Sequence, residues 1–138
     1  MKKRERNSFL TPLDVRVQPS GKTFKLLYPF TYRYRRLGRK FTLTVPAGFE
    51  TDFASIPQPF HVIISKLGRH NKAAVIHDAI YQGAHKLQSS LGYPMVFTRR
   101  QADLIFLDGM EDLGVPVWKR YVMYFGVRLG GWTAWRKR

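Results

Sequence analysis

The sequence predicts an α+β fold, in which a small N-terminal antiparallel β-sheet or hairpin is packed by three to four α-helices. Two patterns lead to this class. Apolar and polar residues alternate with a period of two in the first third of the chain, and from Ser55 onward apolar residues recur every three or four positions. The chain has 138 residues, 44% of them hydrophobic, which suits one domain over residues 1–138 with a core of its own.

Residues 13–54 are expected to be mainly β. Residues 13–18 alternate, and so does the later part of the aromatic-rich run 23–35. One face of that part is aromatic: Phe30, Tyr32 and Tyr34. The opposite face is polar: Thr31, Arg33 and Arg35. Residues 41–45 alternate again, and Leu37-Gly38-Arg39 before them suits a hairpin turn. We therefore predict two or three antiparallel strands.

Residues 55–135 are expected to be mainly α. Helical spacing and terminal signals place helices at four positions: 55–66, 70–82, 98–114 and 116–135. The strongest signal is the capping box that Thr98 forms with Gln101, three residues further on. Gly83 is expected to stop the second helix, and Gly130-Gly131 to bend or end the last one. Residues 85–94 are predicted to form a loop.

The charge balance is strongly basic. Lys and Arg number 24 against nine Asp and Glu, so the formal net charge is +15. This excess, carried partly by an arm at residues 1–7 and a tail at 136–138, indicates an anionic partner such as nucleic acid, an acidic protein or an anionic surface. The absence of cysteine excludes disulfides and cysteine-ligated metal sites. No signal peptide and no membrane-spanning helix are expected, because no long apolar run occurs.

Basic residues gather around the predicted hairpin and at the C-terminus. The candidates for binding an anion or nucleic acid are Arg33, Arg35, Arg36, Arg39, Lys40, Arg136, Lys137 and Arg138. The alternation places the tyrosines of the strand opposite its arginines, so the tyrosines are predicted to be core residues rather than base-stacking ones. The alternative is an edge strand whose charges only prevent aggregation.

The last predicted helix has an apolar stripe. Its members recur at spacings of three or four: Val117, Trp118, Tyr121, Val122, Phe125, Leu129 and Trp132. The simplest interpretation is packing into the core. The alternative is a membrane-surface helix, with Trp118, Trp132 and Trp135 as anchors and the basic tail on anionic lipid.

Acids and histidines occur together in the middle of the chain. Asp52, His77 and Asp103 are candidate ligands for a divalent metal such as zinc, manganese or iron, with Asp78 and His70 as candidate catalytic residues. The alternative is a structural polar network, because buried carboxylates need partners. Its candidate members are Asp52, His77, Arg99, Arg100 and Asp103. Both interpretations stay open at this point.

Several ordered blocks resemble a known family. They are Thr51-Asp52-Phe53-Ala54-Ser55-Ile56-Pro57, Ala73-Ala74-Val75-Ile76-His77-Asp78 with Tyr81, Arg99 with Ala102-Asp103, Phe106 and Met110, and Tyr124-Phe125-Gly126-Val127-Arg128-Leu129-Gly130-Gly131 with Trp132. Together they resemble the DUF1353 family of small bacteriophage and prophage proteins of unknown function. The resemblance implies a phage origin, with location in the virion or the infected-host cytoplasm, but it implies no chemistry.

Three functional hypotheses follow. The first is a non-enzymatic virion-associated or assembly module that binds DNA, phage structural proteins or another acidic partner through its basic surface. The second is a metal-dependent hydrolase that uses the Asp and His residues, which leaves open whether the protein is an enzyme. The third is a membrane-surface protein. The sequence does not determine the oligomeric state.

Overall fold

The structure is a computed structural model that describes residues 8–36, 38–53, 68–83, 86–89, 96–132 and 135. Its elements in these ranges are β1 (Val15–Val17), β2 (Phe24–Leu26), β3 (Phe30–Arg36), β4 (Arg39–Val45), β5 (Glu50–Thr51), α2 (Asn71–Gln82), β6 (Lys86–Ser89), α3 (Arg99–Asp112) and α4 (Val117–Gly130). Antiparallel strands followed by helices confirm the predicted α+β class. The predicted helix at 55–66, the arm and the basic tail lie outside the described residues.

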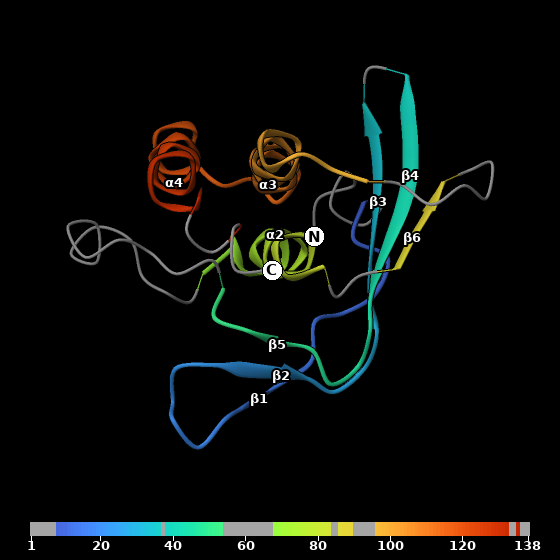
Figure 1. Cartoon of the computed structure of the whole chain (residues 1–138), viewed down its shortest axis with the longest axis vertical. Coiled ribbons are helices and arrows are strands. Elements are labelled where there is room, and N and C mark those ends of the chain that lie inside the picture. Colours follow the sequence, from blue (N-terminus) through green and yellow to red (C-terminus); the bar gives the residue numbers. More distant parts are fainter. Residues whose placement is uncertain are drawn as a thin grey trace.

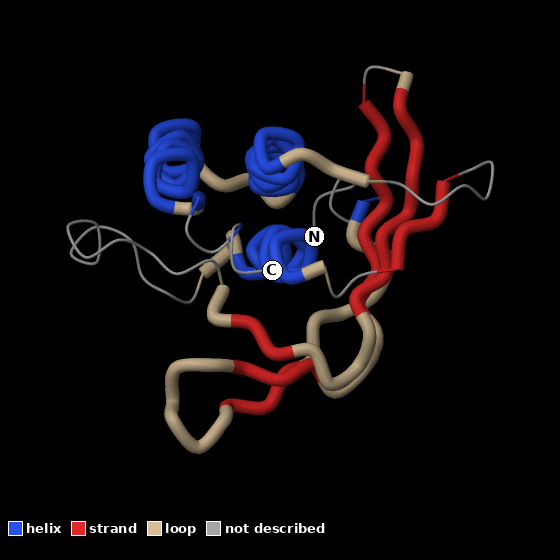
Figure 2. Tube along the Cα trace, in the orientation of Figure 1, coloured by secondary structure: helices blue, strands red, loops and turns tan. Residues whose placement is uncertain are grey.

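The strands form two small sheets around one central helix. One sheet has the order β1-β2-β5 and the other the order β3-β4-β6, with every neighbouring pair antiparallel. In Figure 1, α2 lies between the β1-β2-β5 sheet and α3, the β3-β4-β6 sheet runs beside both α2 and α3, and α4 lies beside α3 on the side away from β3 and β4. Figure 2 shows the same separation, with the strands along two sides of the helix group. This arrangement makes α2 the buried centre of the molecule and α4 its outer helix.

The strand predictions needed correction at three places. The run 23–35 divides into β2 and β3, which belong to different sheets, because Pro29 lacks an amide hydrogen and interrupts the ladder just before β3. The short strand β5 was missed, and β6 occupies part of the predicted loop 85–94. Both are stabilised by partners distant in sequence, β2 and β4 respectively, which local patterns do not reveal.

The β3–β4 hairpin has the two faces that the alternation predicted. Its inner face joins opposed buried pairs, namely Phe30 with Val45, Tyr32 with Leu43 and Tyr34 with Phe41. Tyr34 and Phe41 stack with their ring centroids 4.7 Å apart. Arg33 and Arg35 are exposed on the outer face. The tyrosines are therefore core residues, as predicted.

Helix boundaries agree with the sequence signals. Gly83 ends α2 with a φ of 66°, a left-handed conformation that glycine adopts without strain. Thr98 and Gln101 form the predicted capping box at the start of α3. The last helix ends at Gly130, at the predicted glycine pair. These ends depend on contacts within about four residues, which is why the sequence reveals them.

The prediction that the apolar stripe of α4 packs into the core is wrong. Six of its seven residues are exposed, and Val122 alone is partly buried against the core. The buried residues of α4 are instead Met123 and Gly126. Helical spacing shows that a helix has an apolar face but not what that face contacts.

None of the helices among the described residues has the length and apolarity needed to cross a lipid bilayer.

Candidate functional site

A buried imidazole lies at the junction of the helices. His77 on α2 is 3% exposed, and its Nε2 is 2.7 Å from Oδ1 of Asp103 on α3. Its other nitrogen, Nδ1, lies 3.9 Å from Oδ1 of Asp78. The ring also packs against Tyr81 and Phe106, with centroids 4.2 and 4.8 Å away. One histidine thus lies between two carboxylates in an otherwise apolar interior.

Asp103 is the acceptor on which three elements converge. Its Oδ1 accepts hydrogen bonds from His77 and from the Tyr81 hydroxyl, the latter at 2.6 Å. Its Oδ2 accepts a hydrogen bond from Arg128 of α4 at 2.8 Å, and Arg99 lies 3.6 Å away. A fully buried carboxylate with these donors is satisfied without water.

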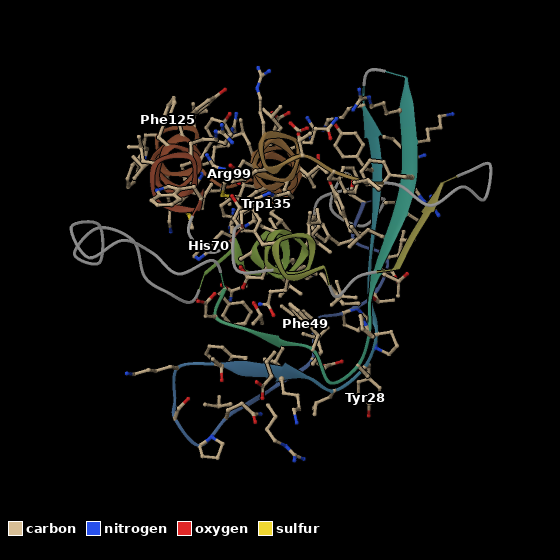
Figure 3. The ribbon with its side chains drawn as sticks, viewed as in Figure 1. Tyr28, Phe49, His70, Arg99, Phe125 and Trp135 are labelled. Carbon is tan, nitrogen blue, oxygen red and sulfur yellow. The ribbon has the colours of Figure 1, made fainter. Side chains whose placement is uncertain are left out.

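Arg99 fastens the end of α4 to α3. Its two terminal nitrogens donate to the carbonyls of Val127 and Arg128, each at 3.1 Å. Figure 3 shows Arg99 in the space between the two helices. A cation at the C-terminus of a helix also interacts favourably with the helix dipole. Gly131 allows the close approach of Tyr81, because a Cβ there would lie 2.7 Å from the Tyr81 hydroxyl oxygen.

Asp78 connects the same cluster to strand β5. Its Oδ2 accepts a hydrogen bond from the Thr51 hydroxyl and another, at 3.2 Å, from the amide of Asp52. The Thr51 hydroxyl oxygen in turn accepts the amide hydrogen of Phe53 at 3.0 Å. Phe53 has a φ of 59°, which is uncommon for a bulky residue, so these bonds hold a strained turn.

Electrostatics favours the charged forms of this cluster. Burial by itself lowers the pKa of His77, but the hydrogen bond to Asp103 and the negative charges of Asp103 and Asp78 raise it above its ordinary value. Burial raises the pKa of Asp103, but its contacts with His77, Tyr81 and Arg128 lower the pKa by more than burial raises it. The net pKa of Asp103 is therefore below the ordinary value. Burial and the His77 contacts act on Asp78 in the same opposed way, and its net pKa is also lowered. The raised pKa of His77 and the lowered pKa values of Asp103 and Asp78 both favour a charged imidazole between charged carboxylates.

The comparisons with known proteins place this chain in a family. The family model "Protein of unknown function (DUF1353)" matches residues 24–127, which include the whole cluster around His77 except Arg128. The chain belongs to the DUF1353 family. It is also 37% identical over 93 residues to "Uncharacterized protein y4jT" of Sinorhizobium fredii (strain NBRC 101917 / NGR234). That similarity covers 64% of this chain and 24% of the relative, so the chain corresponds to about a quarter of the relative's length. No solved structure matches.

In this DUF1353 protein the candidate metal ligands are arranged as hydrogen-bond partners. His77 and Asp103 contact each other directly, while Asp52 joins the cluster through its backbone amide. Among the described residues, no three His, Asp or Glu side chains lie close enough together to hold a metal ion. His70 is buried at the N-cap of α2, with its ring beside Gly68. The contacts of these residues are hydrogen bonds and ion pairs with other groups of the protein.

The network differs in membership from the predicted set. His77, Asp103 and Arg99 are brought together as expected, whereas Arg100 is exposed on the surface of α3. Sequence analysis missed Arg128 and Tyr81 as partners of Asp103. Tyr81 lies four residues after His77 on one helix face, which is the signal that could have identified it.

A second charged cluster was also missed. Arg36, assigned from the sequence to the anion-binding surface, instead bonds Asp112, Glu111 and the backbone carbonyl of Asp108. The hydroxyls of Tyr34 and Tyr32 donate to Asp108 and Asp112 at 3.0 and 3.3 Å. Acids in the last turns of a helix oppose its dipole, and Arg36 compensates for them here. This cluster fastens the hairpin to α3.

The remaining basic candidates of the hairpin stay on the surface. Exposed cations without an ion pair to any described residue are Arg33, Arg35, Arg39 and Lys40, which we call the basic hairpin. Arg136, Lys137 and Arg138 lie outside the described residues.

Proposed function

We propose that this protein is a non-enzymatic binding module, acting in a phage virion or its assembly, that binds DNA or an acidic partner protein through the basic hairpin. The observation that carries the proposal is the register of the hairpin. Within the basic hairpin, Arg35 lies directly opposite Lys40. Like charges in directly opposed positions destabilise a sheet, and a bound anion relieves that cost.

A contrast within the molecule supports this interpretation. The other sheet also opposes two cations, Arg16 and Lys25, but there Glu50 of β5 lies opposite Lys25 on its other side. The basic hairpin has no acid in register with it. The Arg16–Lys25 pair therefore has an internal counter-charge, whereas the basic hairpin requires one from outside.

The buried cluster around His77 also supports a non-enzymatic function. The side chains of His77, Asp78 and Asp103 are buried and engaged with one another or with neighbouring helices. An enzyme needs a reacting group that a substrate reaches. The residues best suited to chemistry are used here to join elements, which leaves the surface to carry the function.

The direct test is binding of a fluorescent DNA duplex, measured by anisotropy at several salt concentrations. We expect Arg35→Gln/Lys40→Gln to reduce the slope of log affinity against log salt by about 2, about one for each cation that contacts a phosphate. The matched control is Arg16→Gln/Lys25→Gln, which removes the same charge from the other sheet and should change the slope much less. Equal losses in both variants would show that only the net charge matters.

A separate binding experiment tests whether the partner is an acidic protein. If the protein binds poly-glutamate but not DNA, and the hairpin variant alone weakens that binding, the partner is an acidic protein. Mass spectrometry of purified particles tests the phage role. Absence from virions, together with no salt-dependent binding to either probe, contradicts the proposal.

A further inference from the structure

An exposed apolar face runs along the outside of α4. It consists of Val117, Trp118, Tyr121, Phe125, Leu129 and, just after the helix, Trp132, with exposures between 42 and 81%. At about 100° per residue these six positions fall within an arc of roughly 120°. Each contributes on the order of 100 Å² of exposed apolar surface, so the patch reaches or exceeds the ~300–600 Å² of the largest patch on a typical monomer.

Polar contacts fix this face outward. Arg128 reaches inward to Asp103, and Arg120 donates to the carbonyl of Val115 at 3.2 Å. Arg99 binds the carbonyls near the C-terminal end of the helix. Rotating α4 to bury its aromatic residues would break these hydrogen bonds and leave the buried carboxylate of Asp103 without its Arg128 partner. Figure 3 shows Phe125 on the side of α4 that faces away from α3.

The surroundings of the apolar face are cationic. Near the N-terminal end of α4, Lys119 extends away from the apolar face toward Gly68, which is followed by the exposed Arg69. Near its C-terminal end, Arg100 is exposed on α3 next to the residue that binds the end of α4. The described acids that contact α4 are paired with arginines: Glu111 with Arg120 and Arg36, and Asp103 with Arg128. The whole chain carries +15.

We propose that the apolar face of α4 docks on the surface of an anionic lipid bilayer. Trp and Tyr prefer the boundary between water and hydrocarbon, where the ring is buried and its polar atom stays hydrated. A surface helix with an aromatic face and basic surroundings lies in that boundary, and anionic lipid adds electrostatic attraction. This site is separate from the basic hairpin and does not depend on the proposed function.

Charge distinguishes this occupant from a second copy of the chain. Two copies joined through α4 would each carry a net charge of +15 and repel each other, whereas an anionic bilayer has the opposite sign. The face is also a convex helix surface, which suits a deformable bilayer. An acidic protein would need a groove shaped to receive it.

The test is co-flotation of the whole protein with vesicles, of phosphatidylcholine alone or with about one third phosphatidylglycerol. We expect binding to the anionic vesicles only, with a blue shift of tryptophan emission. Trp118→Gln/Phe125→Gln should weaken that binding at least about tenfold. The matched control is Val17→Gln/Tyr28→Gln. It removes two apolar side chains that are 59 and 65% exposed, one in β1 and one just after β2, and it should leave vesicle binding unchanged.

Three outcomes would overturn the proposal. The wild-type protein could fail to bind anionic vesicles, as expected if an acidic protein covers the face. The α4 variant could bind them as tightly as wild type, which would mean that charge alone causes binding. Size-exclusion chromatography could show a dimer that the α4 variant dissociates, which would identify a second copy as the occupant. All substituted side chains are exposed, so equal melting temperatures of both variants check their folding, and unchanged DNA binding by the α4 variant keeps the two proposals separable.

Discussion

Two charged clusters hold this molecule together, and they differ in depth. The cluster of His77, Asp78, Asp103 and Arg128 joins α2, α3, α4 and the turn after β5, with Asp103 fully buried. The cluster of Arg36 with the acids of α3 joins the hairpin to that helix, and two of its three carboxylates, Asp108 and Glu111, are 22 and 37% exposed. In the first cluster a charge that loses its partner remains in the protein interior. In the second cluster, water replaces much of what is lost.

The largest expected effect comes from removing the carboxylate at the centre of the deeper cluster. Asp103→Ala leaves the charges of His77 and Arg128 without their main acceptor, and breaking a buried pair from one side costs about 3–5 kcal/mol. Urea denaturation should show this loss in the free energy of unfolding. Asp14→Ala, at an exposed acid, is the control and should change stability by less than about 0.5 kcal/mol. A loss below about 1 kcal/mol at Asp103 would mean that this cluster is no more important than the exposed one.

The same experiment on the shallower cluster should give a smaller effect. Arg36→Met keeps the aliphatic packing but removes the charge that faces Asp108, Glu111 and Asp112. We expect a loss of about 1–2 kcal/mol, reduced by solvent screening and by added salt, because the site is partly exposed. Arg33→Met on the outer face of the same strand should be nearly neutral for stability. If Arg36→Met were as costly as Asp103→Ala, exposure would not explain the difference between the clusters.

The comparison also shows which parts of the structure could be predicted. The ends of α2 and α3 follow from Gly83 and from Thr98 with Gln101, because each signal acts within its own turn. His77 and Asp103 were singled out because polar residues stood in apolar stripes. Their partner Arg128 lies 25 residues beyond Asp103, and Arg36 meets Asp112 across 76 residues. Local sequence patterns contain no information about contacts between residues so far apart in the sequence, so the second cluster was not predicted. The exposed face of α4 was misjudged because the same spacing fits a buried helix.

The smallest effect, and the sharpest distinction between the clusters, is their dependence on pH. A raised His77 pKa means that its contribution is complete below the ordinary value of 6.5 and is lost as pH rises through the folded-state value. Asp103 and Asp78 have lowered pKa values, so their contribution to stability is complete above pH 3.8. It is lost as the pH falls through their folded-state pKa values. The deeper cluster should therefore stabilise the fold most between 3.8 and 6.5.

The shallower cluster should behave differently at higher pH. Burial raises the pKa of Asp108 despite the charge of Arg36, so the stabilising contribution of Asp108 is lost as pH rises from 3.8 through its folded-state pKa. As pH rises above 6.5 through the folded-state pKa of His77, the fall in unfolding free energy is thus expected to come from His77, at about 1.4 kcal/mol for each unit by which its pKa is raised. Urea midpoints of His77→Gln should show that fall removed, while Asp108→Asn should retain it. If both variants kept the wild-type profile, the imidazole would be neutral in the folded protein, and Asp103 would rely on Arg128 and Tyr81 alone.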